Sequence, residues 1–305
     1  MNQESYTRQV RLLIQILPII GEREEFAIKG GTAINLFVRD MPRLSVDIDL
    51  TYIPIQDRNS SLKGITTGLQ EVAERLSSFI PKQQIKKIPG PVKGTVTTLV
   101  IETPQASVTV EVNHVLRGTV FPCKIWDLCT AAREQFKADV QNKILALADL
   151  FGGKICAALD RQHPRDLFDI KLLLENEGIS TETRQAFVVY LASHSRPMHE
   201  LLNPTLLDVR TIFESEFQGM SRISVTYEEI VKTRADLIEK VKNGLTESER
   251  RFLLSVKEGS PKWELLPISG IDRLPGVQWK IQNIKKMDSG KLAAQLKKLK
   301  QCLSL

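Results

Sequence analysis

The chain has 305 residues, of which 42% are hydrophobic and 26% charged, a composition typical of a globular protein that buries a sizeable core. No apolar run approaches the roughly 18 residues of a membrane span, and four scattered cysteines exclude a disulfide framework or a close-paired zinc site. The formal net charge of +6 favours phosphate-rich partners, and the polar residues after Met1 lack a signal-peptide pattern, so a cytoplasmic location without a membrane partner is expected.

The first part of the chain alternates short helices and strands. An apolar stripe predicts an N-terminal helix, and a short apolar run before a Gly-Gly pair predicts a strand that leads into a second helix. Asp40-Met41-Pro42 ends that second helix, because proline disrupts helical hydrogen bonding. The expected elements are helices over 5–20 and 32–38 and strands over 26–29 and 44–53.

Two features of this part carry chemistry. Gly30 and Gly31 enter a helix, where free N–H groups and the positive end of the helix dipole favour phosphate oxygens. Asp47 and Asp49 share one face of the following strand, because side chains alternate between faces. Their backbones lie about 6–7 Å apart, close enough to bind two magnesium ions about 3.5–4 Å apart. Together the two features indicate nucleotidyl transfer.

A β-rich segment follows a longer amphipathic helix over 62–79. In its last strand, three valines share one face and Glu111 lies on the other. Glu111 is a natural third metal ligand if this strand lies beside the strand of Asp47 and Asp49, and an ordinary outward-facing glutamate otherwise. The expected strands are 84–88, 95–102 and 107–114.

From residue 144 the chain is expected to be mostly helical. We therefore expect a mixed α/β domain over 1–117 and a helical domain over 118–305, with the boundary near Gly118. Lysines gather at 82–93 and at 285–300, where they form either a solvated charged face or a track for an RNA backbone. The expected helices are 144–160, 165–175, 183–193, 227–243 and 247–257.

Lys154 falls in the middle of an apolar stripe of the helix over 144–160, and Arg161 extends the same face. A cation there would reach the phosphates of a nucleotide at the diglycine turn and stabilise their charge. A lysine that only extends its ammonium to solvent is the alternative. In the next helix, capping alone would explain Asp166, and Arg165 with Asp169 could be a plain i,i+4 ion pair.

The first region resembles the AbiEii/AbiGii toxin family, nucleotidyltransferase-like toxins of bacterial toxin–antitoxin and phage-defence systems that include the MenT toxins. That family shows Gly-Gly-Ser/Thr and then Arg-x-Ser/Thr-x-Asp-x-Asp at this interval. A glycine that often precedes the motif arginine is absent from the run Arg39-Asp40-Met41-Pro42-Arg43, which leaves the loop shape over the nucleotide open. The matching positions are Gly30, Gly31, Thr32, Arg43, Ser45, Asp47 and Asp49.

A second segment resembles the family's later motif, in which a lysine and a downstream carboxylate belong to the active site. It reads Leu-Phe-Gly-Gly-Lys, then Arg, then Arg-Asp-Leu-Phe-Asp. We favour Asp169 over Asp166 as the active-site carboxylate, because capping accounts for Asp166. The matching positions are Lys154, Arg161, Arg165, Asp166 and Asp169.

The resemblance implies an α+β fold, with a polymerase-β-like nucleotidyltransferase core and mixed sheet followed by a helical domain that contributes Lys154 and Asp169 to the cleft. It implies transfer of a nucleoside monophosphate from a nucleoside triphosphate to RNA, in some relatives to the 3′ end of tRNA, with growth inhibition countered by an antitoxin. The expected site has Asp47, Asp49, Lys154 and Asp169 as catalytic residues, Mg²⁺ on Asp47, Asp49 and Glu111, and the nucleotide on Gly30, Gly31, Thr32, Arg43, Ser45 and Arg161.

Two alternatives stay open. The same metal site would serve nucleotidylation of a protein hydroxyl or of a small molecule, which needs a closed pocket rather than a broad positive surface. A non-enzymatic protein could keep the fold and only bind RNA or a partner. The carboxylate pair argues against this second alternative, because adjacent like charges are unfavourable without a cation.

Overall fold

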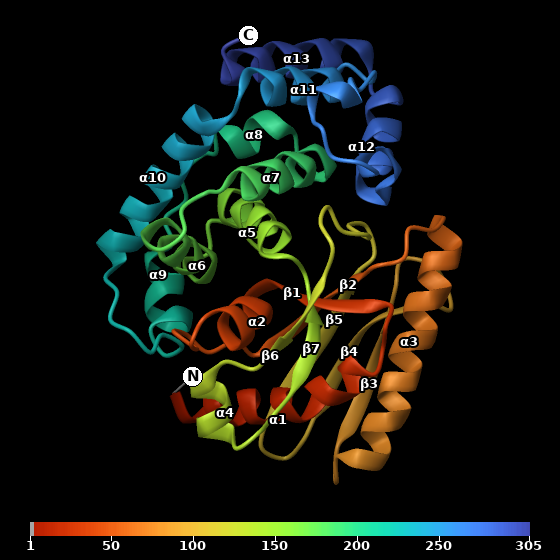
Figure 1. The fold of residues 1–305 in the computed structure, drawn as a ribbon, viewed down its shortest axis with the longest axis vertical. Helices are drawn as coiled ribbons and strands as arrows, with labels where there is room; N and C mark the ends of the chain where they lie inside the picture. The colour runs from red at the N-terminus through yellow and green to blue at the C-terminus, as the bar shows by residue number, and fades with distance from the viewer. Residues whose placement is uncertain (1–2) are drawn as a thin grey trace. The chain divides into compact units, whose positions relative to one another are not determined.

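The computed structural model describes residues 3–305, and the chain divides into two compact units (Figure 1). The first unit contains the residues up to Ala146 together with Glu214–Ser224, and the second contains Leu147–Phe213 and Val225–Leu305. The expected boundary near Gly118 differs from this division. Two further strands after Gly118 complete the sheet of the first unit, and a short segment from much later in the chain returns to it.

The first unit is built on a mixed seven-stranded sheet with the order β3-β4-β5-β2-β1-β7-β6. β2 pairs in parallel with β5, β1 pairs in parallel with β7, and the remaining neighbours are antiparallel. The sequence does not predict β6 and β7, because neither short strand shows a clear apolar alternation. The strands are β1 Phe26–Lys29, β2 Asp47–Tyr52, β3 Gln84–Pro89, β4 Val96–Glu102, β5 Ser107–Asn113, β6 Lys124–Asp127 and β7 Gln141–Ile144.

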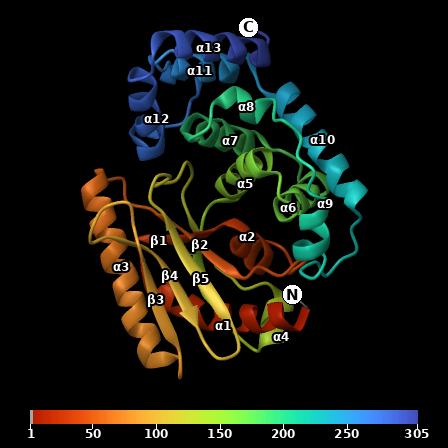
Figure 2. The same ribbon diagram turned by 180° about the vertical axis from the view of Figure 1, so that it is seen from behind.

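Helices pack against this sheet. α1 contacts β5 and β7, and α3 lies along β4 (Figure 2). The expected helix over 32–38 begins two residues earlier and changes to π-helical geometry after Ala33. The helical elements are α1 Gln3–Gly21, α2 Gly30–Ala33, the π-helix η1 Ile34–Val38, α3 Arg58–Phe79 and α4 Thr130–Phe136.

The alternation expected for the two central strands is confirmed. In β2, Ile48 and Leu50 are fully buried while Asp47 is exposed and Asp49 half-buried. In β5 the three valines are buried and Glu111 is exposed. Burying one large apolar side chain stabilises the fold by about 1.5–3 kcal/mol. This gain fixes which face of each strand turns inward. The acidic side chains are thereby left on the opposite face.

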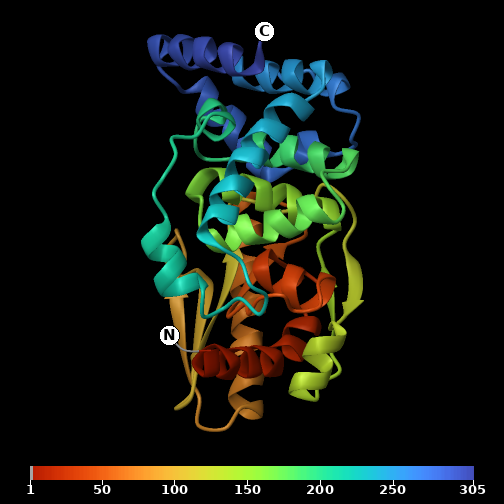
Figure 3. The same cartoon turned by 90° about the vertical axis from the view of Figure 1, so that its left-hand side faces the viewer.

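The second unit is helical, as expected for this part of the chain. α5 and α7 pack at very short range, since a β-carbon on Gly152 would lie 2.7 Å from the backbone nitrogen of Phe187. Figure 3 shows α10, in cyan, lying across α5, α6 and α8. The α-helices of this unit with five or more residues are α5 Leu147–Arg161, α6 Pro164–Glu175, α7 Thr181–Ser193, α8 Met198–Leu202, α10 Tyr227–Gly244, α11 Glu247–Lys257, α12 Pro275–Lys285 and α13 Ser289–Leu303.

Smaller helical segments complete the chain, namely α9 Arg210–Ile212, η2 Phe213–Phe217, η3 Trp263–Leu265 and η4 Ile271–Arg273. Trp279 lies in α12 and is 39% exposed. Within residues 3–305, no helix has both the length and the apolar character that crossing a membrane requires.

Candidate functional site

The diglycine turn and the Asp49 carboxylate are in close contact in the first unit. Antiparallel pairing of β1 with β2 sets Lys29 opposite Asp49, so the next residue, Gly30, lies beside the carboxylate. Gly30 has a φ of +68°, and a β-carbon there would lie 2.5 Å from Oδ2 of Asp49. Only glycine combines this backbone conformation with this approach. The turn therefore brings backbone N–H groups and an acidic oxygen to one place.

Gly31 faces a second pair of predicted residues. A β-carbon on Gly31 would lie 2.6 Å from a terminal guanidinium nitrogen of Arg43 and 3.0 Å from Oγ of Ser45. Arg43 is only 2% exposed, and its Nη1 donates to the Leu44 carbonyl at 3.0 Å. A buried guanidinium thus lies directly beside the diglycine turn, where its charge favours an anion.

Residues distant in sequence hold the segment that carries Arg43, ahead of β2. A β-bridge joins Arg43 to Ser221, the Leu44 N–H donates to the Met220 carbonyl, and the Arg222 N–H donates to the Pro42 carbonyl. This pairing lies within the first unit and explains why the 214–224 segment belongs to it. The sequence does not predict this support, because a short irregular segment so far along the chain has no periodic pattern.

Thr32 connects the turn to β2. Its Oγ1 lies 3.0 Å from Oγ of Ser45 and 2.5 Å from the Asp47 carbonyl oxygen. Thr32 is 1% exposed and Ser45 is 7% exposed. The structure thus gives both hydroxyls a role in fixing the diglycine turn against β2, and their assignment to phosphate binding stays a prediction.

The third carboxylate lies beside the second. Parallel pairing of β2 with β5 places Glu111 directly opposite Asp49 and Thr109 opposite Asp47, so the condition set for Glu111 in the sequence analysis is met. Paired strands lie about 4.7–4.9 Å apart, so the backbones of Asp49 and Glu111 are direct neighbours. Among residues 3–305, no three Asp, Glu, His or Cys side chains are gathered closely enough to hold an ion together. The common metal set of Asp47, Asp49 and Glu111 therefore stays a prediction.

The later motif forms a charge cluster inside the second unit. The Lys154 ammonium contacts Oδ1 of Asp166 at 2.8 Å and Oδ2 of Asp169 at 3.0 Å. All three side chains are at most 5% exposed. The guanidinium of Arg161 binds the same Asp166 carboxylate through Nε at 2.5 Å and Nη2 at 3.1 Å, while its side chain is 61% exposed. Lys154 is thus paired with carboxylates rather than extended into solvent.

Asp166 proves to have a different role from the capping that we considered. The α6 N-terminus is capped by His163, whose Nδ1 accepts from the Arg165 N–H at 3.1 Å. Burial alone would raise the pKa of Asp166, but the charges of Lys154 and Arg161 hold that pKa well below its ordinary value. The reason for preferring Asp169 over Asp166 is therefore removed, since both carboxylates contact Lys154 and both are buried.

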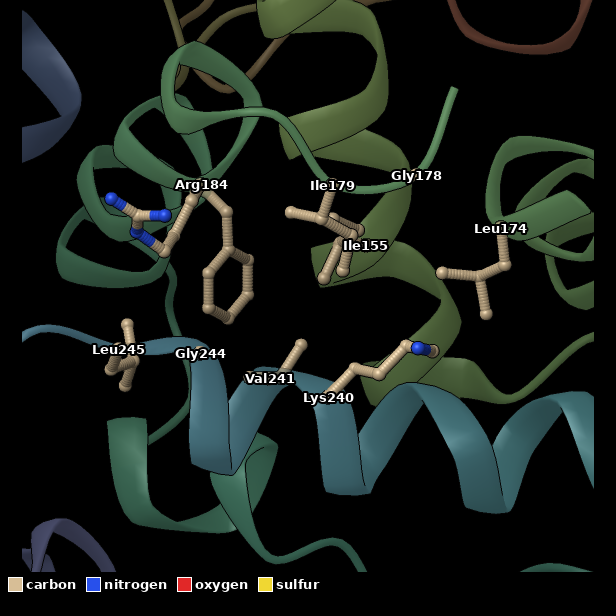
Figure 4. A pocket seen from close by; sticks show the side chains of 10 residues that line it. Ile155, Leu174, Gly178, Ile179, Arg184, Lys240, Val241, Gly244 and Leu245 are labelled. Atoms are coloured by element: carbon tan, nitrogen blue, oxygen red, sulfur yellow. The ribbon is translucent and has the colours of Figure 1, made fainter. Parts of the chain in front are cut away.

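A separate cavity of about 220 Å³ lies within the second unit (Figure 4). Apolar side chains such as Ile155, Leu174 and Phe187 line most of it, together with the basic residues Arg184 and Lys240. Arg184 is already paired, since its Nε lies 3.0 Å from both carboxylate oxygens of Glu249. The residues predicted for the reaction are not among those that line this cavity.

A comparison with protein families shows to which family this chain belongs. The family described as "Nucleotidyl transferase AbiEii toxin, Type IV TA system" matches residues 11–283, which is most of the chain. The chain belongs to the AbiEii family of nucleotidyltransferase toxins. The resemblance seen in its two motifs is thereby confirmed, and the activity class is that of a nucleotidyltransferase of a type IV toxin–antitoxin system. Membership of such a system implies a cognate antitoxin.

A solved structure supports the fold of this AbiEii-family protein. The chain is similar to MenT4, a nucleotidyltransferase toxin from Mycobacterium tuberculosis H37Rv, with a TM-score of 0.59 and 13% sequence identity. The similarity covers 81% of this chain and 86% of the MenT4 chain. It confirms the expected α+β nucleotidyltransferase fold. No curated protein sequence matches this chain significantly.

Proposed function

We propose that this AbiEii-family protein transfers a nucleoside monophosphate from a nucleoside triphosphate to a hydroxyl group of an RNA acceptor. The observation that carries the proposal is the approach of the Asp49 carboxylate to Gly30, with Glu111 opposite Asp49 on the neighbouring strand. Phosphate-binding N–H groups and metal-binding oxygens must lie together for phosphoryl chemistry. In this proposal, the contact of Gly30 with Asp49 at the end of β1 would supply both.

Residues of the turn would bind the triphosphate. The N–H groups of Gly30 and Gly31 are suited to phosphate oxygens, and the buried Arg43 guanidinium beside Gly31 adds a fixed positive charge. Thr32 and Ser45 hold this turn to β2 through their hydroxyls. Preorganised donors of this kind lower the barrier because they need no reorganisation as charge develops.

Asp47 and Asp49, with Glu111, fit a magnesium ion by the chemistry of their donor atoms, since Mg²⁺ prefers hard carboxylate oxygens. A glycine at position 30 leaves open the space beside Asp49 that any other side chain would fill. When bound, Mg²⁺ would neutralise phosphate charge and polarise the reacting phosphoryl group. The carboxylates would orient the acceptor hydroxyl and the α-phosphate relative to each other.

We also propose that Lys154 and Asp169 act in the same reaction. The support is the family's later motif and the fully desolvated contact between the two side chains. In this role Asp169 and Asp166 would orient the Lys154 ammonium, and Lys154 with Arg161 would balance negative charge on the nucleotide. Asp166 is a positioning residue in this proposal, because both cations contact it.

The RNA acceptor, with the 3′ end of tRNA as its preferred form, rests on the family resemblance and on the lysine-rich C-terminal part. α12 and α13 include Lys285, Lys291, Lys297, Lys298 and Lys300. Lysines of this kind neutralise backbone phosphates and make binding strongly dependent on salt. Inhibition of growth or translation, relief by an antitoxin and a role in phage defence belong to the same proposal.

A transfer assay tests the proposal. Purified protein is incubated with Mg²⁺, each labelled nucleoside triphosphate in turn, and total RNA, tRNA, a protein mixture or small hydroxyl compounds. We expect label on RNA only with Mg²⁺ present, and at least about a hundredfold less with Asp49→Asn, because loss of metal binding removes several kcal/mol of stabilisation. Asp139→Asn, which changes an exposed carboxylate of the same unit, should keep full activity. Label on a protein or small compound instead of RNA, or equal transfer by Asp49→Asn, would contradict the proposal.

A further inference from the structure

Three basic side chains gather where β2 and β5 end. Arg58 is the first residue of α3, and His114 and Arg117 lie in the loop after β5. The loop is fixed, because Oδ1 of Asn113 accepts from the N–H groups of Val115 and Leu116. The Gly118 N–H donates to the carbonyl of Tyr52, the last residue of β2, at 2.8 Å. All of these residues belong to the first unit.

Arg117 has more hydrogen-bonding capacity than its surroundings satisfy. It is only 7% exposed, and its buried Nε has no hydrogen-bond partner among residues 3–305. Its Nη1 reaches the Asp57 carbonyl oxygen at 3.5 Å, a long contact. A buried donor of a charged group without an acceptor is costly. The Arg117 side chain can therefore take a further acceptor, which residues 3–305 do not supply.

Other positively charged groups act on Arg117 and His114. Burial lowers the pKa of Arg117 and of His114, and the charge of Arg58 lowers both further. The nearby acids compensate in part, since Asp57 acts on Arg117 and Glu111 acts on His114 in the opposite direction. The carboxylate of Asp57 already accepts from the N–H groups of Asn59 and Ser60 at the start of α3. An anion is the partner that would relieve this repulsion.

We propose that Arg58, His114 and Arg117 bind a phosphate group, and that this group is a backbone phosphate of the acceptor strand. The second half of the proposal rests on the proposed transfer to RNA. His114 lies three residues after Glu111, in the loop that follows β5. We assign this phosphate to the acceptor strand because the nucleotide phosphates are already assigned to the N–H groups of Gly30 and Gly31. Forked guanidinium groups suit phosphate oxygens, and a phosphate would give the Arg117 guanidinium a further acceptor.

The test measures binding rather than turnover. In ¹⁵N-labelled full-length protein, the Nε–H signal of Arg117 is assigned by its loss in Arg117→Lys. The protein is then titrated without metal with inorganic phosphate, with a ribonucleotide trimer that has no terminal phosphate, and with a nucleoside triphosphate. We expect the Arg117 signal to move with inorganic phosphate and with the trimer. Arg58→Ala should weaken this binding at least about tenfold, the effect of one charge-assisted hydrogen bond.

Lys63→Ala is the matched control, because Lys63 is also exposed on α3 but lies beyond the basic cluster. It should change the affinity less than about twofold, the usual effect of a distant surface charge. An unmoved Arg117 signal with all three ligands, or unchanged affinity in Arg58→Ala, would overturn the site. Movement with the nucleoside triphosphate alone would overturn its assignment to the acceptor. Trimer binding by a protein that transfers no label would instead reject the transfer reaction and support the phosphate site.

Discussion

A β-carbon on Gly30 would lie 2.5 Å from Oδ2 of Asp49. Gly30 directly follows β1 and Asp49 lies on the antiparallel neighbour β2, opposite Lys29, so the contact is set by the β1–β2 register rather than by the loop between the strands. Any side chain at position 30 would have to displace the carboxylate that we assign to the metal. The diglycine turn and the acidic strand are thus one structural unit, and changes at Gly30 should affect both.

Gly30→Ala should lower both stability and activity. Alanine at a φ of +68° is strained, which costs about 1–3 kcal/mol, and its methyl group would also push Asp49 aside. We expect transfer activity to fall at least about a hundredfold, because a small misplacement of a reacting group has effects of this size. Urea unfolding and the transfer assay measure the two quantities.

Gly94→Ala is a control that introduces backbone strain without displacing a neighbouring side chain. Gly94 has a φ of +82°, but a β-carbon there would meet no atom within 4 Å. This variant should show a similar backbone strain of about 1–3 kcal/mol and unchanged activity per folded molecule. If both variants lose activity equally, or if Gly30→Ala stays fully active, the geometric role of Gly30 is wrong.

Thr32→Val should reveal whether the Thr32 hydroxyl is a structural contact. Valine keeps the shape but leaves the Asp47 carbonyl and Ser45 hydroxyl without their partner, which should cost about 1–3 kcal/mol of unfolding free energy. Thr32→Ser keeps the hydroxyl and should recover most of it. A large rise in the KM for the nucleoside triphosphate with unchanged stability in Thr32→Val would instead favour direct phosphate binding.

Lys154→Met should destabilise the second unit strongly. It leaves the fully buried Asp169 carboxylate without the Lys154 ammonium, and loss of one partner from a buried ion pair costs about 3–5 kcal/mol. The double variant Lys154→Met/Asp169→Asn removes both charges and should recover at least about 1 kcal/mol relative to the sum of the single changes. Urea unfolding of the four proteins in this cycle measures the coupling.

The control for this cycle is Arg251→Met, which breaks an exposed i,i+4 pair with Glu247. Such a pair contributes only about 0.3–0.5 kcal/mol, so the unfolding free energy should change little. Simple additivity of the Lys154 and Asp169 changes would show that the two side chains are not energetically coupled.

The acid sensitivity of the protein should depend on Asp166. Lys154 and Arg161 hold its pKa below the ordinary value of 3.8, although burial acts in the opposite direction. A carboxyl whose pKa is lower in the folded state contributes stability that is complete above about pH 5 and is lost as the pH falls further. The stability difference between the natural protein and Asp166→Asn should therefore be constant from pH 7 to about 5 and shrink below it. Urea unfolding at each pH measures this difference, and a constant value down to pH 3 would contradict the assignment.

The local sequence pattern was enough to predict much of the structure of the first motif. The alternation of Asp47 and Asp49 with Ile48 and Leu50 predicted which face is acidic, because a strand side chain has only two directions and the apolar ones bury. A Gly-Gly pair after a short apolar run likewise predicted the turn at Gly30. The helices α5, α6, α7, α10 and α11 were found within a few residues for the same reason, since their apolar periodicity is contained in the local sequence.

The pairing of distant segments was decided only by the tertiary structure. The sequence could state what Glu111 would do beside Asp49, but the β2–β5 register that brings them together joins strands about 60 residues apart. The same holds for the contact of Arg43 with Ser221, for the two short strands β6 and β7 that complete the sheet, and for the shared contact of Asp166 and Asp169 with Lys154. Periodicity reports which way a side chain turns within its own element, whereas the choice of neighbour depends on the packing of the entire core. By itself, the sequence therefore determined the residue types and faces of the site, and the fold decided which of them meet.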